Sequence, residues 1–111
     1  DQGGTYYRPH KHIDKGECFH IIEGQMALFT FDDEGTVTDA CQLDPEQTIM
    51  YRVGVNMYHA VMALTPIVVY HESKPGPYLQ DDDSVFPPWA PNNWDEAQIS
   101  RYCEELLRVL Q

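Results

Sequence analysis

The sequence has 111 residues, of which 18 are Asp or Glu and 7 are Lys or Arg, for a net charge of −11. This length fits one domain with a sizeable core, and the 42% apolar content argues against disorder. So few cations disfavour a general surface for nucleic acid or for an anionic membrane, and no apolar run approaches the ~20 residues of a membrane span. Three widely spaced cysteines, an odd number, favour reduced thiols and a cytoplasmic location, and an oxidising compartment in which two distant cysteines pair is the alternative.

Short strands separated by turns are predicted for the first two thirds of the chain. In residues 25–31, successive side chains alternate between two strand faces, and Asp32-Asp33-Glu34-Gly35 follows them as a hairpin turn. Residues 67–73 are rich in β-branched side chains. Many short strands of this kind predict an all-β sandwich or barrel. The predicted strands cover residues 6–12, 18–22, 25–31, 36–41, 48–53, 59–64 and 67–73.

The last third of the chain has a different character. Two proline-rich segments, 74–78 and 87–91, cannot be regular helix. Residues 94–110 follow with apolar side chains at intervals of three and four, which predicts an amphipathic helix. We expect its apolar stripe to cover the β domain or a partner subunit. The chain then divides into a metal-binding domain over 1–91 and a helical segment over 92–111.

The motif His10-Lys11-His12 is the most informative one. In a strand, residues i and i+2 point to the same face, so two imidazoles converge on one point, which suits a metal ion. Glu17 follows after a turn, and its carboxylate joins the same site if the next strand pairs with the first. Imidazole and carboxylate together suit Mn, Fe, Ni, Cu or Zn and do not choose among them. Taken alone, the His-x-His pattern also fits a chance occurrence in an exposed strand.

The spacing around this motif resembles that of a known superfamily. Gly4, five residues, His10-x-His12, four residues, Glu17, six residues and Gly24 match the first motif of the cupins at every interval. The match is specific because it fixes five positions over 21 residues.

The second cupin motif, P-x-G-x-x-H followed by an asparagine, is similar to residues 54–59. Gly54 stands in place of the proline, and Asn56 stands in place of the glycine, which a left-handed turn tolerates. Ala63 occupies the position of the asparagine. These departures weaken the turn signature, but the expected third histidine ligand is retained as His59.

A closer resemblance extends over most of the chain. It is carried by Tyr7-Arg8-Pro9-His10-Lys11-His12, Phe31-Asp32-Asp33-Glu34-Gly35, Glu72-Ser73-Lys74-Pro75-Gly76-Pro77-Tyr78 and Trp89-Ala90-Pro91. Together these segments look like the WbuC family of cupin-fold metalloproteins, which occurs in bacterial O-antigen gene clusters. Members usually carry a further N-terminal segment, so we expect this chain to be shortened. The resemblance implies an all-β cupin jelly-roll barrel, with the α-helix C-terminal to it, in which one divalent metal ion is bound by His10, His12, Glu17 and His59.

Alternation also directs further side chains towards this site. Tyr6 and Arg8 share a strand face with the two histidines of the motif, so Arg8 is expected beside the metal. A guanidinium in that position needs an anion. The partner is either Glu17 or Glu72, which would be a structural role, or an anionic group of the ligand.

The later part of the chain offers weaker candidates for ligand binding. Tyr70 shares a predicted strand face with Glu72 and is either a cavity hydroxyl or a core aromatic. Lys74 and Tyr78 flank a Pro-Gly-Pro turn that is either the mouth of the cavity or a surface turn. The strand faces directed away from the cavity carry Cys18, His20 and His71.

The family context implies a single-metal cupin that acts on a small carbohydrate or sugar-acid ligand. The implied activity is that of an isomerase or epimerase in bacterial surface-polysaccharide (O-antigen) biosynthesis. Two alternatives stay open: a non-haem iron dioxygenase, and a non-catalytic module in which the metal anchors a ligand. As partners we expect the small-molecule ligand and, by analogy with many cupins, a second copy in a homodimer, with neither nucleic acid nor membrane.

Overall fold

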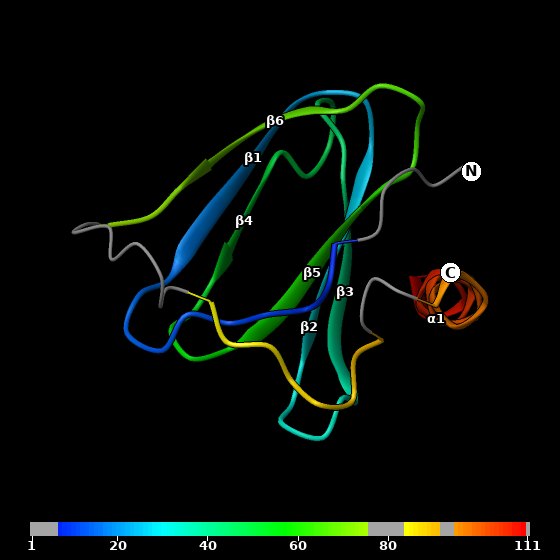
Figure 1. Cartoon of the computed structure of the whole chain (residues 1–111). Coiled ribbons are helices and arrows are strands. Elements are labelled where there is room, and N and C mark those ends of the chain that lie inside the picture. The colour runs from blue at the N-terminus through cyan, green and yellow to red at the C-terminus, as the bar shows by residue number, and fades with distance from the viewer. Residues whose placement is uncertain (1–6, 76–83, 92–94, 111) are drawn as a thin grey trace.

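The computed structural model describes residues 7–75, 84–91 and 95–110, which form six β-strands and one α-helix (Figure 1). The prediction of a mostly β fold with a C-terminal helix is confirmed. No helix in these ranges has the length and apolar character that crossing a membrane requires. The elements are β1 (Glu17–Glu23), β2 (Met26–Phe31), β3 (Val37–Leu43), β4 (Met50–Val53), β5 (Tyr58–Ala63), β6 (Val69–Ser73) and α1 (Glu96–Leu110).

The strands form two antiparallel three-stranded sheets, in the orders β4-β1-β6 and β3-β2-β5. Because successive side chains alternate between faces, each sheet contributes one set of apolar residues to a shared core. The expected closed barrel is not seen among the described strands, because no backbone ladder joins one sheet to the other. The arrangement is compatible with a β-sandwich. Its core contains Phe19, Ile21, Met26, Leu28, Leu43 and Val53, each no more than 2% exposed.

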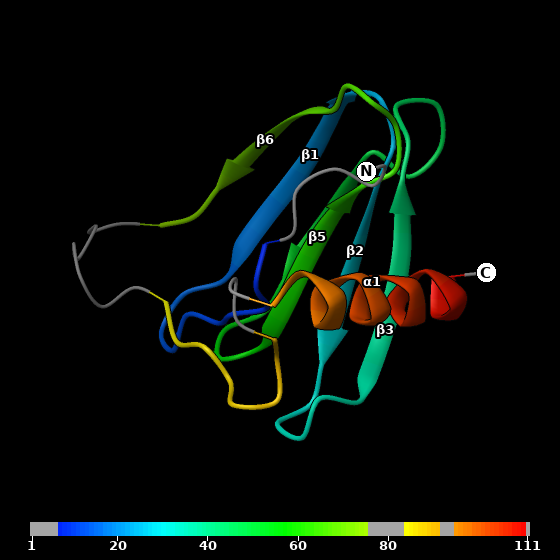
Figure 2. The same cartoon turned by 45° about the vertical axis from the view of Figure 1, so that its right-hand side comes forward.

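A second core lies between the helix and the β3-β2-β5 sheet. Figure 2 shows α1 lying across the strands of this sheet. Leu106 is 4% exposed and packs in one cluster with Phe29 and Phe31. All six residues of β2 are buried because the strand is covered by the other sheet on one face and by the helix on the other. The Asp95 carboxylate caps the helix by accepting a hydrogen bond from the Gln98 N–H at 3.0 Å.

Gly24 carries the chain from one sheet to the other, between β1 and β2. Its φ is +83°, in the left-handed region that favours glycine. A Cβ atom at this position would lie 2.1 Å from the carbonyl oxygen of Ile67. Both the backbone conformation and the lack of space therefore require glycine at this crossing.

The predicted strand over residues 6–12 is wrong. Within the described part of this segment, His10 and Lys11 make isolated bridges to His59 and Val85, and no continuous strand forms. The buried Pro9 has no N–H to donate, so a regular ladder cannot continue through it. The bridge to His59 nevertheless fixes the position of His10 against the edge of β5.

Candidate metal centre

Backbone pairing holds His10 beside His59. The His10 N–H donates to the His59 carbonyl at 3.1 Å, and the His59 N–H donates to the His10 carbonyl at 2.9 Å. As a result, the centroids of the two imidazole rings lie 4.6 Å apart. His12 is positioned by a hydrogen bond of 2.7 Å from the Asn56 N–H to its carbonyl. Asn56 has a φ of +56°, the left-handed conformation predicted for this position of the motif.

Glu17 brings a carboxylate to the same place from the first residue of β1. It is paired with Val53 of β4 and is only 2% exposed. One ligand atom from each of the four predicted metal ligands lies within 4.8 Å of the others. Three members are buried and His10 is half-buried. The structure thus brings together a group that can hold a metal ion, formed by His10, His12, Glu17 and His59.

The contacts inside the group are short, but they lack the geometry of hydrogen bonds. Glu17 Oε1 lies 2.8 Å from His59 Nε2 and 3.2 Å from His12 Nε2. Both carboxylate oxygens of Glu17 and the Nε2 atom of His59 are therefore buried without a hydrogen bond. Buried polar atoms are rarely left in this state. Ligand atoms that lie this close together, with buried members lacking hydrogen bonds, are the arrangement expected of a metal site.

Two of the imidazoles are oriented by the backbone. His10 Nδ1 lies 3.3 Å from the Arg8 carbonyl, and His59 Nδ1 lies 3.1 Å from the Met57 carbonyl. A carbonyl oxygen only accepts, so the proton of each neutral ring is assigned to Nδ1. That tautomer leaves the lone pair on Nε2. Such outer contacts fix ring orientation and tautomer in metal-binding histidines.

The electrostatics of the group favour the protonation states that metal ligands need. Burial, followed by the nearby His59, lowers the pKa of His10 to about 4. Burial alone would raise the pKa of Glu17, but the close approach of His59 and Glu72 outweighs it and holds the pKa at about 2. At neutral pH the imidazole of His10 is therefore uncharged and the carboxylate of Glu17 is charged, as coordination requires.

A cavity of about 260 Å³ is lined by His10 and His59, two of the four predicted metal ligands. Of the predicted ligand-binding residues, Arg8, Tyr70 and Glu72 line this cavity. Lys74 does not, and it lines a different cavity at the end of β1. Tyr6 and Tyr78 lie outside the described residues. The complete lining consists of Tyr7, Arg8, His10, Phe19, His59, Ala60, Val61, Tyr70 and Glu72.

Glu72 differs from Glu17 in its tendency to ionise. Burial and the closeness of Glu17 raise the pKa of Glu72 to about 7, because two neighbouring carboxylates resist carrying two charges. Tyr70 lies on the same strand face, and burial followed by the charge of Glu72 raises its pKa. This wall of the cavity therefore offers two groups that can hold a proton near the metal ligands.

Arg8 reaches the cavity, but its contacts differ from the predicted ion pair with Glu17 or Glu72. Its Nη2 atom donates to the Pro87 carbonyl at 3.0 Å, and its guanidinium carbon lies 5.1 Å from the centroid of the Phe86 ring. The Nε atom of Arg8 is buried and has no hydrogen-bond partner. The side chain is thus held in place by neutral groups, and no carboxylate of residues 7–75, 84–91 or 95–110 forms an ion pair with it.

Sequence reasoning missed two aromatic residues at this site. Tyr7 lines the cavity although alternation from His10 would turn it away, because the residues before His10 are not in a strand and have no period of two. Phe86 packs on Arg8 and lies 6.1 Å from the ring of His10. It comes from a segment far along the chain, and no motif in the sequence marks it.

The N-terminal part of the chain matches a family model. The family is described as a domain of unknown function (DUF6016), and the match covers residues 2–43. That stretch contains His10, His12 and Glu17, whereas His59 lies beyond it. A search of curated proteins finds no match.

Proposed function

We propose that the chain is a cupin-type metalloprotein with one divalent metal ion at His10, His12, Glu17 and His59. The observation that carries this proposal is the convergence of four ligand atoms within 4.8 Å, with buried Glu17 and His59 atoms that lack hydrogen bonds. Two facing antiparallel sheets agree with a jelly roll, although they do not require one. The likeness of the sequence to the WbuC family supports the same assignment.

We further propose that the adjoining cavity takes a small anionic carbohydrate, such as a sugar acid, for isomerisation or epimerisation. The bound metal supplies a Lewis acid that polarises an oxygen of the ligand. Arg8 binds the carboxylate of the ligand, because its side chain lines the cavity and its guanidinium suits a carboxylate. Glu72 moves the proton, because its carboxyl group lines the cavity together with His10 and His59.

Elemental analysis of protein purified without added metal tests the metal site. We expect about one equivalent of a transition metal per chain in the wild type. The variants Glu17→Gln and His59→Ala should lose this bound metal. Glu23→Gln is the matched control, because Glu23 lies on the same strand and is exposed. Unchanged metal content in the two site variants would show that these side chains are not the ligands.

The activity assay separates the candidate functions. Interconversion of sugar-acid isomers that depends on the metal and on Glu72 supports the isomerase. Iron content together with oxygen consumption supports a dioxygenase, since imidazoles and a carboxylate also suit iron. Tight ligand binding without turnover of either kind supports a binding module.

A further inference from the structure

The outer face of the β4-β1-β6 sheet carries a row of metal-binding side chains that the interior site does not use. In the register of the sheet, His20 on β1 lies opposite His71 on β6 and opposite Met50 on β4. All three are exposed, with Met50 at 52%, while the flanking Phe19 and Ile21 are buried in the sandwich. The row therefore points to the opposite side of the sheet from the candidate metal centre.

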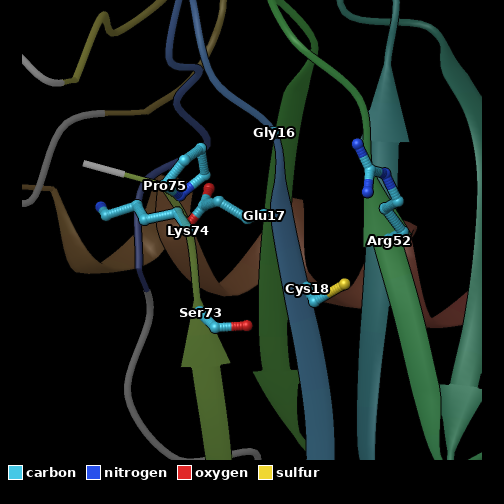
Figure 3. A pocket seen from close by; sticks show the side chains of 7 residues that line it. All are labelled: Gly16, Glu17, Cys18, Arg52, Ser73, Lys74 and Pro75. Atoms are coloured by element: carbon cyan, nitrogen blue, oxygen red, sulfur yellow. The ribbon is translucent and has the colours of Figure 1, made fainter. Parts of the chain in front are cut away.

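Cys18 adds a thiol to the same face. It lies two residues before His20, so strand alternation turns both side chains outwards. Its cross-strand neighbours are Arg52 on β4 and Ser73 on β6. Figure 3 shows the thiol of Cys18 between these two side chains, at a cavity of about 290 Å³ whose lining also includes the neighbouring Glu17. The thiol is free and only partly buried, so it is accessible from this cavity.

We propose that His20, His71, Met50 and Cys18 form a second metal site, and that its ion is monovalent copper. Thiolate and thioether are soft ligands that select Cu⁺, and imidazole also suits copper, whereas hard cations prefer carboxylate oxygens. The two cross-strand rows, Met50–His20–His71 and Arg52–Cys18–Ser73, contain no carboxylate, although 18 of the 111 residues of the chain are acidic.

The spacing of the sheet brings His20 and His71 within reach of a common ion, and Met50 and Cys18 are the next side chains on the same face. Side chains that lie opposite each other on antiparallel strands have Cβ atoms about 4.5–5.5 Å apart. His20 and His71 are a pair of this kind, and both are exposed, so their rings can turn without disturbing the core. Neither imidazole makes a hydrogen bond or an ion pair within the described part of the chain. The ligands are therefore available to a metal ion.

The charge of the neighbouring Arg52 favours a monovalent ion over a divalent one. Coulomb repulsion grows in proportion to charge, so a Zn²⁺ ion near this guanidinium meets twice the repulsion of a Cu⁺ ion. The interior group has the opposite character, because Glu17 supplies a buried carboxylate that suits a divalent ion. The two sites should thus select different metals.

A competition titration with a chromogenic chelator of Cu⁺, under reducing conditions without oxygen, tests this proposal on the full chain. We expect one Cu⁺ per chain in the wild type and in His59→Ala, which alters the interior site only. In the double variant His20→Gln/His71→Gln, the affinity for Cu⁺ should fall by about tenfold or more, as for the loss of roughly 1.4 kcal/mol or more. Ser73→Ala, on the same face, is the control and should bind as the wild type does.

Two results would overturn the proposal. One is wild-type affinity for Cu⁺ in the double variant, which would mean that the histidines of the outer face are not ligands. The other is loss of Cu⁺ binding in His59→Ala alone, which would place the ion in the interior group. Circular dichroism of each variant establishes that the fold is retained, and exposed side chains such as His20 and His71 are expected to tolerate replacement.

Discussion

The hydroxyl of Tyr51, on β4, donates a hydrogen bond to the carboxylate of Asp39, on β3, and so links the two sheets directly. Each residue lies on the inward face of its strand, since Tyr51 is paired with Phe19 and Asp39 with Thr30. Apart from this link and the Glu17–His59 contact, the described core between the sheets is built from apolar side chains. This polar link therefore has directional geometry that the apolar core does not provide.

Ionisation of Tyr51 should weaken the fold at alkaline pH. Burial, followed by the hydrogen bond and the charge of Asp39, raises the pKa of Tyr51 to about 12 from an ordinary value of 10. The folded state holds this proton more tightly than the unfolded state, so its contribution is fully present below pH 10 and is lost as the pH rises towards about 12. Denaturant unfolding of wild type and Tyr51→Phe across this range should show a steeper loss in the wild type. Equal slopes would contradict the assignment.

Replacement of Gly24 should be far more harmful than replacement of Gly54. Gly24→Ala forces a side chain into a left-handed conformation and against the Ile67 carbonyl, at a cost of roughly 2 kcal/mol or more in the free energy of unfolding. At Gly54 the nearest atom to an added Cβ is Met57 Cε, at 3.9 Å, and the backbone is not left-handed. Gly54→Ala should leave stability unchanged or raise it by up to about 1 kcal/mol. Similar losses in both variants, measured by urea unfolding, would show that the turn is not constrained as described.

The helix should contribute to stability through its buried face. Leu106→Ala removes a side chain that is 4% exposed and leaves a cavity against the sheet, so we expect a loss of about 2–5 kcal/mol. Val109→Ala, at a position 53% exposed on the same helix, should change the free energy of unfolding by less than about 1 kcal/mol. Equal midpoints of urea unfolding for the two variants would show that the buried face of the helix does not stabilise the fold.

Arg8 should affect ligand binding and leave metal binding intact. If it binds the carboxylate of a sugar acid, Arg8→Ala loses a charge-assisted hydrogen bond of about 1.5–3 kcal/mol, which is roughly a tenfold to a hundredfold rise in Kd. Calorimetric titration of the metal-loaded protein with glucuronate measures this change, and neutral glucose is the control ligand. A fall in metal affinity with unchanged glucuronate binding would assign Arg8 to the metal centre.

Local pattern in the sequence was sufficient to predict most of the strands. The strand predicted over residues 67–73 is observed as β6 at Val69–Ser73, and the one over 25–31 as β2 at Met26–Phe31. Both were predictable because β-branched side chains and an alternating pattern favour extended strands. What failed depended on pairing over long distances. Whether the sheets close into a barrel is decided by backbone ladders between segments far apart in the chain, which no local pattern reports.

In the candidate site, too, the residues close together in sequence could be predicted, whereas the contacts between distant segments could not. His10, His12 and Glu17 are close in sequence, and their convergence could be predicted from alternation and one turn. His59 depended on likeness to a known motif, because nothing local indicates that it pairs with His10. The Arg8 contacts could not be predicted, since the Pro87 carbonyl and the Phe86 ring come from a segment without regular structure.

Because β6 is an exposed strand at the edge of its sheet, it should open locally more often than the other strands that line the cavity. All five of its residues are exposed, and β1 is its partner on one side, with no described strand on the other. Its amide hydrogens should therefore exchange with solvent through local opening, while those of the doubly covered β2 should exchange only when the whole fold opens. Tyr70 and Glu72 belong to the quickly exchanging strand, and His59 belongs to the strand beside β2. We therefore expect the β6 wall of the cavity to open more readily than the β5 wall that carries His59.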